Sequence, residues 1–163
     1  MSDHGEPAMT DHIEAQLKKS GITLPVPTAP VANYVPFVKT ANLIFVSGQL
    51  PMRDGTVQYK GSVGIDISIE DASEAAKLCA INLIAQAKVA CDGDLDRIRR
   101  VVKITGFVAS GREFTDHPKV VNGASDTMVD VFGDNGRHAR AAVGSSSLPM
   151  GAAVEVEAIF EFV

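Results

Sequence analysis

Residues 153–163, AVEVEAIFEFV, carry the pattern that decides the fold. Two sets of side chains alternate along this stretch: the first is Val154, Val156, Ala158, Phe160 and Phe162, and the second is Glu155, Glu157, Ile159 and Glu161. Successive side chains of a strand point to opposite faces of a sheet, so this period of two predicts one long strand with a buried and a polar face. The chain is therefore expected to be built on a sheet.

The segments before it predict the rest of that sheet and two main helices. Strands are expected at 34–39, 43–47, 99–109 and 138–143, with a weak one near 57–59 after the turn sequence Arg53-Asp54-Gly55-Thr56. The strongest helix spans 69–91, with Ser68 as its N-cap and Gly93 as its stop. Its apolar stripe is narrow and mostly alanine, which predicts close packing on the sheet: Ala72, Ala76, Cys79, Leu83, Ala87 and Ala90.

A second main helix is expected at 118–132, with one apolar face formed by Val121, Ala124, Met128 and Phe132. The resulting order of elements predicts an α+β fold, in which a mixed sheet carries both main helices on one face. The opposite face would need a cover, and association with further copies of the chain would provide it.

Residues 1–30 form an extension before the main domain at 31–163. We expect a disordered start over 1–9, a helix from Thr10 to Lys19 and a proline-rich connector at 24–30. Ile13 and Leu17 would form the apolar side of that helix, and Gly21 would end it. A chain of 163 residues is long enough for one domain with a full core and too short to suggest two.

Composition excludes several classes of function. Hydrophobic residues make up 45% and charged residues 21%, which is typical of a globular protein and not of a disordered one. The net charge of −5 disfavours nucleic acid as a partner, because phosphate contacts need a basic surface. No apolar run is long enough to span a membrane and no signal peptide is visible, so a cytoplasmic location is expected.

The common cofactor motifs are missing from the sequence. There is no Gly-x-Gly-x-x-Gly after a strand, no phosphate loop, and no metal-ligand spacing among the four histidines, so neither a cofactor nor a metal is expected. Cys79 and Cys91 lie on one predicted helix, about 18 Å apart along its axis. They are therefore expected to be reduced thiols.

Arg140, in the strand sequence HARAAVG at 138–144, is the main candidate for binding a ligand. It shares a strand face with His138 and Ala142, and its small neighbours leave room to grip a carboxylate through two nitrogens. A structural ion pair with a glutamate of an adjacent strand is the competing interpretation. Glu155 or Glu157 would lie near Arg140 if the last two strands pair with each other.

Three further positions have both a functional and a plain interpretation. Ser47 and Gly48 end a strand, where backbone N–H groups can bind an anion or simply form a turn. Asn122 lies off the apolar stripe of its helix, so it faces either solvent or a neighbour.

Six stretches together resemble the reactive intermediate deaminase family, called RidA, YjgF or L-PSP proteins. They are YVPFVK (34–39), LIFVSGQLP (43–51), VVKITGFVAS (101–110), VNGASDTMVDVFG (121–133), HARAAVG (138–144) and LPMGAAVEVEAIF (148–160). The resemblance extends over about residues 31–163. Its most specific part is the arginine strand followed by Leu-Pro and Val-Glu-Val-Glu-Ala.

The resemblance implies a chorismate-mutase-like α+β fold, assembled as a homotrimer with ligand clefts between subunits. It implies that Arg140 holds the carboxylate of the substrate and that Glu155 helps to place the attacking water. It also implies substrate contacts from Tyr34, Ser47, Gly48 and Asn122.

Ala142 stands where the best-studied deaminase branch has a cysteine, so no thiol nucleophile is available at this position. The resemblance still allows the backbone carbonyl of Ala142 to hold water, and with the extension it indicates a sister branch. The expected activity is hydrolysis of an amino-acid-derived enamine or imine to a 2-oxo acid and ammonia. The alternatives are a non-catalytic protein that binds or senses a small carboxylate and, less favoured, an endoribonuclease.

Overall fold

The computed structural model describes residues 11–27, 29–30 and 32–163. The expected disordered start and the expected cap at Thr10 lie outside these residues. The elements in chain order are α1 (His12–Lys19), β1 (Phe37–Thr40), β2 (Leu43–Gln49), β3 (Met52–Arg53), β4 (Thr56–Val57), α2 (Ile69–Ala90), β5 (Ile98–Ala109), α3 (His117–Phe132), β6 (Ala139–Ser145) and β7 (Val154–Phe162), with 3-10 turns at Leu95–Arg97, Gly133–Gly136 and Pro149–Gly151.

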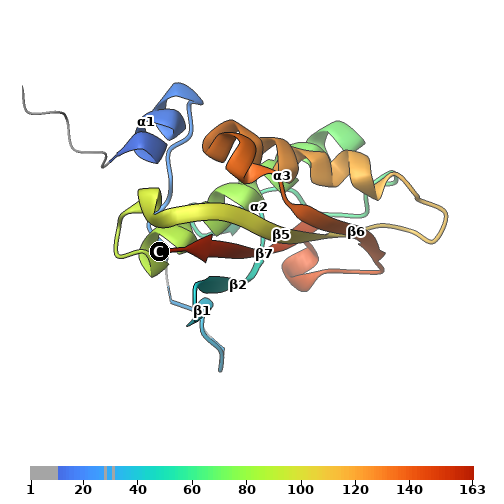
Figure 1. Cartoon of the computed structure of the whole chain (residues 1–163). Helices are drawn as coiled ribbons and strands as arrows, with labels where there is room; N and C mark the ends of the chain where they lie inside the picture. Colours follow the sequence, from blue (N-terminus) through green and yellow to red (C-terminus); the bar gives the residue numbers. More distant parts are fainter. Residues whose placement is uncertain (1–10, 28, 31) are drawn as a thin grey trace, which may run out of the picture.

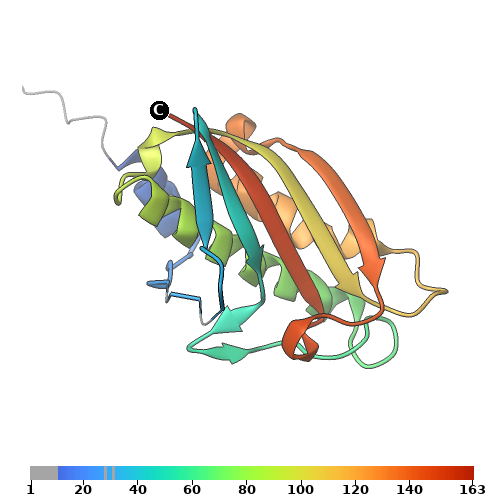
Figure 2. The same ribbon diagram turned by 90° about the horizontal axis from the view of Figure 1, so that it is seen from below.

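The main sheet has five strands in the order β1-β2-β7-β5-β6. Only β5 and β6 run parallel, so the sheet is mixed, as predicted. Both α2 and α3 lie on one side of this sheet (Figure 1). Figure 2 looks onto the opposite side, where the five strands lie in front of the helices. The α+β architecture with its two main helices on one face is therefore confirmed.

Small residues set the spacing within the helical layer. The predicted alanine stripe of α2 is buried, with Ala72, Ala76 and Ala87 fully inaccessible. Gly123 of α3 lies directly on the backbone carbonyl of Ser73 in α2, so that any side chain at this position would overlap it. The two helices therefore contact each other almost backbone to backbone, and α3 is held at one fixed place above the sheet.

The predicted turn at Asp54-Gly55 forms the tip of a hairpin. Both residues have positive φ, 53° and 76°, as a two-residue hairpin turn with this sequence requires. The hairpin joins β3 to β4 in a separate two-stranded sheet. The weak strand expected near 57–59 is thus shorter and begins one residue earlier, at Thr56.

The last two strands do not pair with each other. β5 lies between β6 and β7, pairing in parallel with the first and antiparallel with the second. The crossover through α3 returns the chain beside β5 at the edge of the sheet, and the Pro149–Gly151 turn then carries it past β5 to the inner position. The expectation that either Glu155 or Glu157 reaches Arg140 across a β6–β7 pair is therefore wrong.

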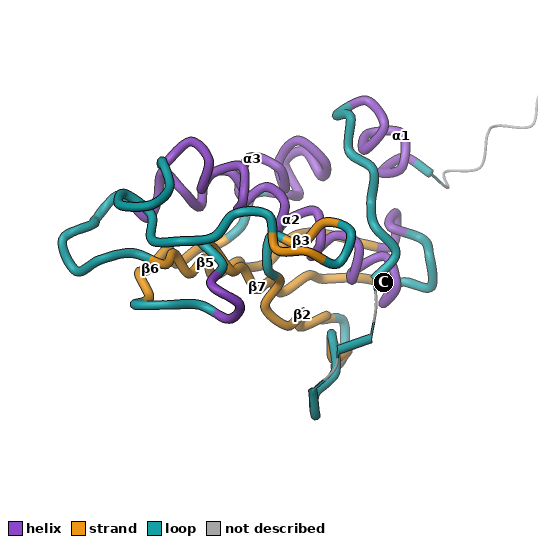
Figure 3. The backbone as a smooth tube through the Cα atoms, turned by 180° about the vertical axis from the view of Figure 1, so that it is seen from behind, coloured by secondary structure: helices purple, strands orange, loops and turns teal. Residues whose placement is uncertain are grey.

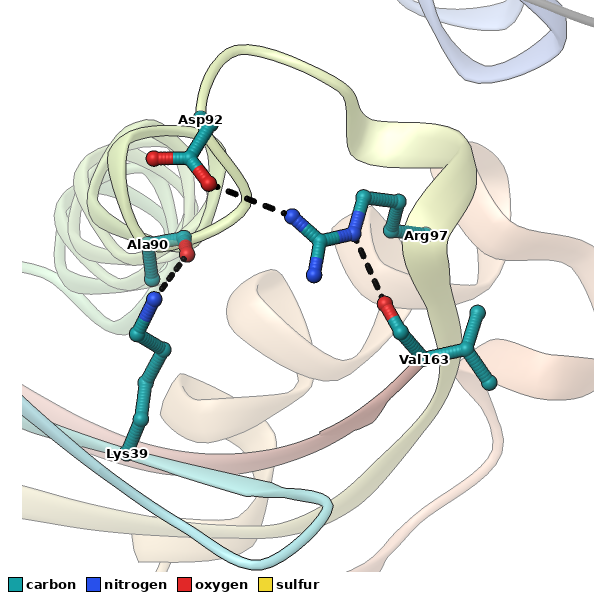
Figure 4. Close-up of polar contacts among 5 residues, drawn as sticks. All are labelled: Lys39, Ala90, Asp92, Arg97 and Val163. Carbon is teal, nitrogen blue, oxygen red and sulfur yellow. Dashed lines mark hydrogen bonds and ion pairs between the residues drawn. The ribbon is translucent and has the colours of Figure 1, made fainter.

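The corner where β1, α2, β5 and β7 meet is fixed by two cations (Figure 4). Lys39 Nζ donates to the carbonyl of Ala90 at 3.0 Å, at the C-terminal end of α2, where the helix dipole favours a positive charge. Arg97 Nε donates to the carbonyl of Val163 at 2.7 Å and approaches Asp92 at 3.4 Å. These contacts hold β1 against α2 and hold the end of β7 against the start of β5.

The two cysteines are free and buried, as predicted. Burial raises the pKa of both thiols, so they remain protonated near neutral pH. Within the described ranges, no helix combines the length and the apolar character needed to cross a membrane.

Helix α1 stands at one end of the helical layer (Figure 3) and docks through its apolar side and its N-terminal end. Ile13 and Leu17 are buried, as predicted, and Gly21 ends the helix with a positive φ of 70°. The carboxylate of Asp96 accepts the N–H groups of both His12 and Ile13 at 2.9 Å, so a residue 84 positions away supplies the N-terminal cap.

We expect Asp96→Ala to lower the free energy of unfolding by about 1 kcal/mol, as for the loss of a helix cap. Partial burial by itself would raise the pKa of Asp96, but the N–H groups of Ile13 and His12 outweigh it and lower the pKa. The contribution is therefore present at neutral pH and is lost as pH falls through this lowered pKa. Urea denaturation at several pH values measures it.

Asp126→Asn provides the control, because Asp126 is an exposed carboxylate of α3. An equal effect from both substitutions at every pH would contradict the capping role of Asp96. Amide hydrogen exchange over 12–19 then locates the change, since loss of the cap should speed exchange in α1 first.

Candidate functional site

Arg140 lies on β6, the edge strand of the sheet, with its side chain on the helix-facing side. One nitrogen, Nη1, donates to Asn122 Oδ1 at 2.8 Å and to Ser125 Oγ at 3.2 Å. Both partners lie on α3, three residues apart and hence on one face of that helix. The guanidinium is thus oriented by α3 while its side chain stays exposed.

A chain of hydrogen bonds continues from Arg140 to the backbone. His138 Nδ1 lies 2.6 Å from the carbonyl of Gly136, and a carbonyl can only accept, so Nδ1 carries the proton. In the neutral ring Nε2 then accepts from Ser125 Oγ at 2.9 Å. The Ser125 hydroxyl therefore accepts from Arg140 and donates to His138, and this polarity holds the guanidinium in one position.

The surroundings of Arg140 do not favour a structural ion pair. Among the described residues, no carboxylate lies within 4 Å of its guanidinium. Ala142, the next residue on the same strand face, is partly buried, and its methyl group leaves space beside the cation. The arrangement can bind an anion through the free edge of the guanidinium, as Arg–carboxylate pairs do.

Glu155 forms a second cluster, on β7 and on the opposite face of the sheet. Its carboxylate lies over Gly48, where any Cβ atom would overlap Glu155 Oε1. The absence of a side chain at Gly48 leaves the space that the Glu155 carboxylate occupies, at the bulged end of β2. Burial raises the pKa of Glu155, and the negative charge of Glu157 raises it further.

Ser47 is placed beside this cluster, but its polar groups already have partners. Its N–H donates to the carbonyl of Pro36 at 2.9 Å, and its hydroxyl donates to the carbonyl of Val35 at 2.8 Å. The Ser47 N–H is therefore already engaged by residues 35–36 in this chain, and the expected substrate contacts of Ser47 and Gly48 stay predictions. Tyr34 precedes these residues and is 57% exposed.

The candidate residues thus form two half-sites instead of one site. Arg140, Asn122 and Ala142 lie by α3 on the helix-facing side, whereas Glu155 and Gly48 lie on the free side with β5 in between. The described part of the chain does not bring these two groups together. A reaction that needs both must draw them from two copies of the chain.

The structure adds residues that the sequence patterns did not single out. Ser125 bridges Arg140 and His138, and its spacing of three residues from Asn122 is the signal that would have found it. Ser110 Oγ and His117 Nε2 lie 3.3 Å apart near the far end of β6. Nothing in the local sequence indicates this second pair, because the two residues meet only through the 110–117 loop.

Other binding features lie apart from these clusters. A cavity of about 480 Å³ opens between residues 21–25, the β3–β4 hairpin and α2, and none of the candidate residues named above lines it. Within the described ranges, no group of three or more His, Cys, Asp or Glu side chains lies together in a way that could hold a metal ion.

The raised pKa of Glu155 gives a direct test of the second cluster. We expect Glu157→Gln to lower the pKa of Glu155, because it removes the nearby negative charge that favours the protonated form. Titration of the side-chain carboxyl carbons by NMR measures the change. Glu161→Gln serves as the control, since Glu161 shares this strand face but does not contribute to the shift; an equal decrease in both variants would contradict the assignment.

Comparisons with known proteins agree with the fold and identify the family. The model of a family described as "YjgF/chorismate_mutase-like, putative endoribonuclease" matches residues 14–161. Protein TCP17 of Trypanosoma cruzi is 45% identical over 150 residues, which are 91% of this chain and 93% of that protein. The RutC family protein y4sK of Sinorhizobium fredii is 33% identical over 129 residues, or 79% and 86% of the two chains.

Solved structures give the same result. Atu1372 of Agrobacterium tumefaciens, whose function is described as unknown, is 54% identical, with a TM-score of 0.87 over 93% of this chain and 92% of its own. A "putative endoribonuclease" of Shewanella oneidensis is 32% identical, with a TM-score of 0.88 over 92% and 99%. Because the family match spans almost the whole chain and the fold agrees, the protein belongs to the YjgF, or RidA, family.

Proposed function

We propose that this protein hydrolyses 2-imino acids and their enamine tautomers to 2-oxo acids and ammonia, at sites shared between two copies of the chain. The observation that carries the proposal is the pair of half-sites. One offers a positioned cation for a carboxylate, and the other offers a carboxyl group, Glu155, whose pKa is raised by burial and by Glu157.

Arg140 binds the carboxylate of the substrate. Asn122 and Ser125 occupy only Nη1, and the described residues leave Nε and Nη2 without hydrogen-bond partners. These two nitrogens form the edge that a carboxylate engages through two parallel hydrogen bonds. Binding there fixes the C=N carbon beside Ala142 and converts the attack of water into a reaction within one complex.

Glu155 of a second copy handles the protons. Its carboxylate takes a proton from water as the hydroxyl oxygen bonds to the C=N carbon, and it returns this proton to the imine nitrogen to give a carbinolamine. The same carboxylate then moves the hydroxyl proton to the amino nitrogen as the C=O bond forms and the C–N bond breaks. Ammonia leaves and the 2-oxo acid remains, so imine plus water balances 2-oxo acid plus ammonia. A pKa raised by burial and by Glu157 keeps the group able both to accept and to return a proton.

The half-sites also suggest how the copies assemble. The surface around Arg140 differs from the surface around Glu155, so a head-to-tail contact can join these unlike patches, and repeating it about one axis closes a ring. The free face of the sheet carries Phe45 and Val143, which are 42% and 43% exposed and would be covered by such contacts. We propose a ring of three copies, a homotrimer.

The first test generates 2-aminoacrylate with a dehydratase and follows the loss of the imine. We expect this protein to accelerate the loss, and we expect Arg140→Ala to reduce the rate by at least about 100-fold, since positioning of the substrate is lost. Arg137→Ala is the matched control, because Arg137 is an exposed arginine three residues earlier. No acceleration over buffer at stoichiometric protein would refute the proposed activity.

A second test asks whether the site is shared. The Arg140→Ala variant and the Glu155→Gln variant are each expected to be inactive. When the two variants are mixed, unfolded and refolded together, part of the activity should return. Some sites then combine the intact Arg140 of one copy with the intact Glu155 of another. Each variant refolded alone is the control. Activity that never returns in mixtures that do co-assemble would contradict the two-copy site.

The same experiments also test two alternative functions. A protein that only senses a carboxylate would bind 2-oxo acids without hydrolysing any imine. Ribonuclease activity is favoured only by the words of the family description, and both ring nitrogens of His138 are already engaged. Cleavage of RNA that survives Arg140→Ala and disappears on purification would indicate a contaminant.

A further inference from the structure

The helix-facing side of β6 is an accessible strip, in contrast to the same side of its neighbour. On β5 the residues facing the helices are buried, including Ile104, Gly106 and Val108. On β6 the facing residues paired with them are the exposed Arg140, the partly buried Ala142 and the exposed Gly144. The helices cover β5 and extend only partly over β6, so Arg140 and Gly144 stay exposed and Ala142 is only partly buried.

The far end of the strip is closed by an imidazole. His117, the first residue of α3, lies over Gly144, with Nε2 2.6 Å from the position that a Cβ atom would occupy. Ser110 Oγ lies 3.3 Å from the same nitrogen and 3.1 Å from the same Cβ position. Phe114 packs edge-on against the ring of His117, with the ring centroids 5.3 Å apart. The absence of a side chain at Gly144 therefore makes room for a supported polar pair.

The hydrogen bonds of this pair leave one ring nitrogen available. The Ser110 hydroxyl donates either to the carbonyl of Val108, at 3.2 Å, or to His117 Nε2. In the first case Nε2 carries the proton and Nδ1 is an acceptor; in the second case Nδ1 carries it and is a donor. No described residue is hydrogen-bonded to Nδ1. The free ring nitrogen is thus an acceptor in one tautomer and a donor in the other, so the pair can bind either a donor or an acceptor.

The distance between Arg140 and the Ser110–His117 pair sets the length of a ligand that can contact both. Four residues of strand separate Arg140 from Gly144, or about 13 Å, and two residues separate Ala142 from Gly144, or about 6.6 Å. A substrate whose carboxylate is on Arg140 and whose reacting carbon is beside Ala142 needs a side chain of roughly four to five heavy atoms to cover the second distance.

We propose that Ser110 and His117 form a distal subsite that selects 2-imino acids with a side chain ending in a carboxamide. This inference rests on the proposed function, because it names the substrate class of the same site. A carboxamide has both a donor and an acceptor, which matches a neutral Ser–His pair whose proton can move. An apolar chain of the same length would leave these polar groups without a partner, and discrimination on that basis is typically strong.

The test compares imines made by an amino-acid oxidase from glutamine and from norleucine, whose side chains have similar lengths but different ends. We expect wild-type protein to prefer the glutamine imine, by at least about tenfold in kcat/KM, and we expect His117→Ala to remove most of that preference, as for the loss of one hydrogen bond. Gly144→Ala should act in the same way, because its methyl group displaces the imidazole without removing it.

Lys119→Ala is the control for these variants. Lys119 is exposed on the same helix, and its one described partner is the side chain of Asp116, so the preference should stay at the wild-type value. Thermal unfolding of each variant checks that the fold is intact. Equal kcat/KM for the two imines in wild-type protein, or a preference unchanged in both His117→Ala and Gly144→Ala, would overturn the proposal.

Calorimetry separates this proposal from the activity on which it rests. If wild-type protein hydrolyses no imine at all, the proposed function fails, and the subsite is then judged by binding alone. Glutaramate carries a carboxylate and a carboxamide at similar spacing, whereas hexanoate has an apolar end. Tighter binding of glutaramate that is lost in His117→Ala supports the subsite, and equal binding of the two ligands overturns it.

Discussion

The contact between α2 and α3 is the constraint on which the rest of the structure depends. Gly123 lies on the backbone carbonyl of Ser73, and the alanine stripe of α2 is buried in the core. Interiors packed at this density do not adjust continuously, so α3 has one position above β5. Asn122, beside Gly123 in sequence, therefore reaches Arg140 at 2.8 Å. The orientation of the candidate ligand-binding arginine is thus a consequence of helix packing.

The same contact explains why the edge strand is the place where chemistry can occur. α3 covers β5, through the close approach of Val121 to Gly106, and extends only partly over β6. A buried arginine would need a permanent counter-ion, whereas Arg140 at this margin is held by neutral groups and stays exposed. A fully covered sheet would be more apolar, but it would leave no cation free to bind a ligand.

Local patterns predicted the elements well, and long-range arrangement poorly. The alternation in 153–163 and the alanine stripe of 69–91 depend on neighbours within one element, so they identified β7 and α2 nearly to the residue. The order of the strands depends on which segments meet, and no local sequence pattern predicts that β5 lies between β6 and β7. The hydrogen bond from the Ser47 N–H to Pro36 could not be predicted either, because it also depends on which segments meet. Only the family resemblance favoured a ligand-binding role for Arg140 over an ion pair.

The raised pKa of Glu155 shows that this residue is kept at a cost to the fold. A carboxyl group whose pKa is higher in the folded chain than in the unfolded chain destabilises the fold as pH rises from the ordinary value through the raised one, and the penalty persists above it. Glu157 beside it adds to this penalty, and Gly48 gives up a side chain to admit the carboxylate. A sheet selected for stability alone would place a neutral residue at 155. The proposed role of Glu155 in proton transfer gives a reason for a carboxyl group at this position.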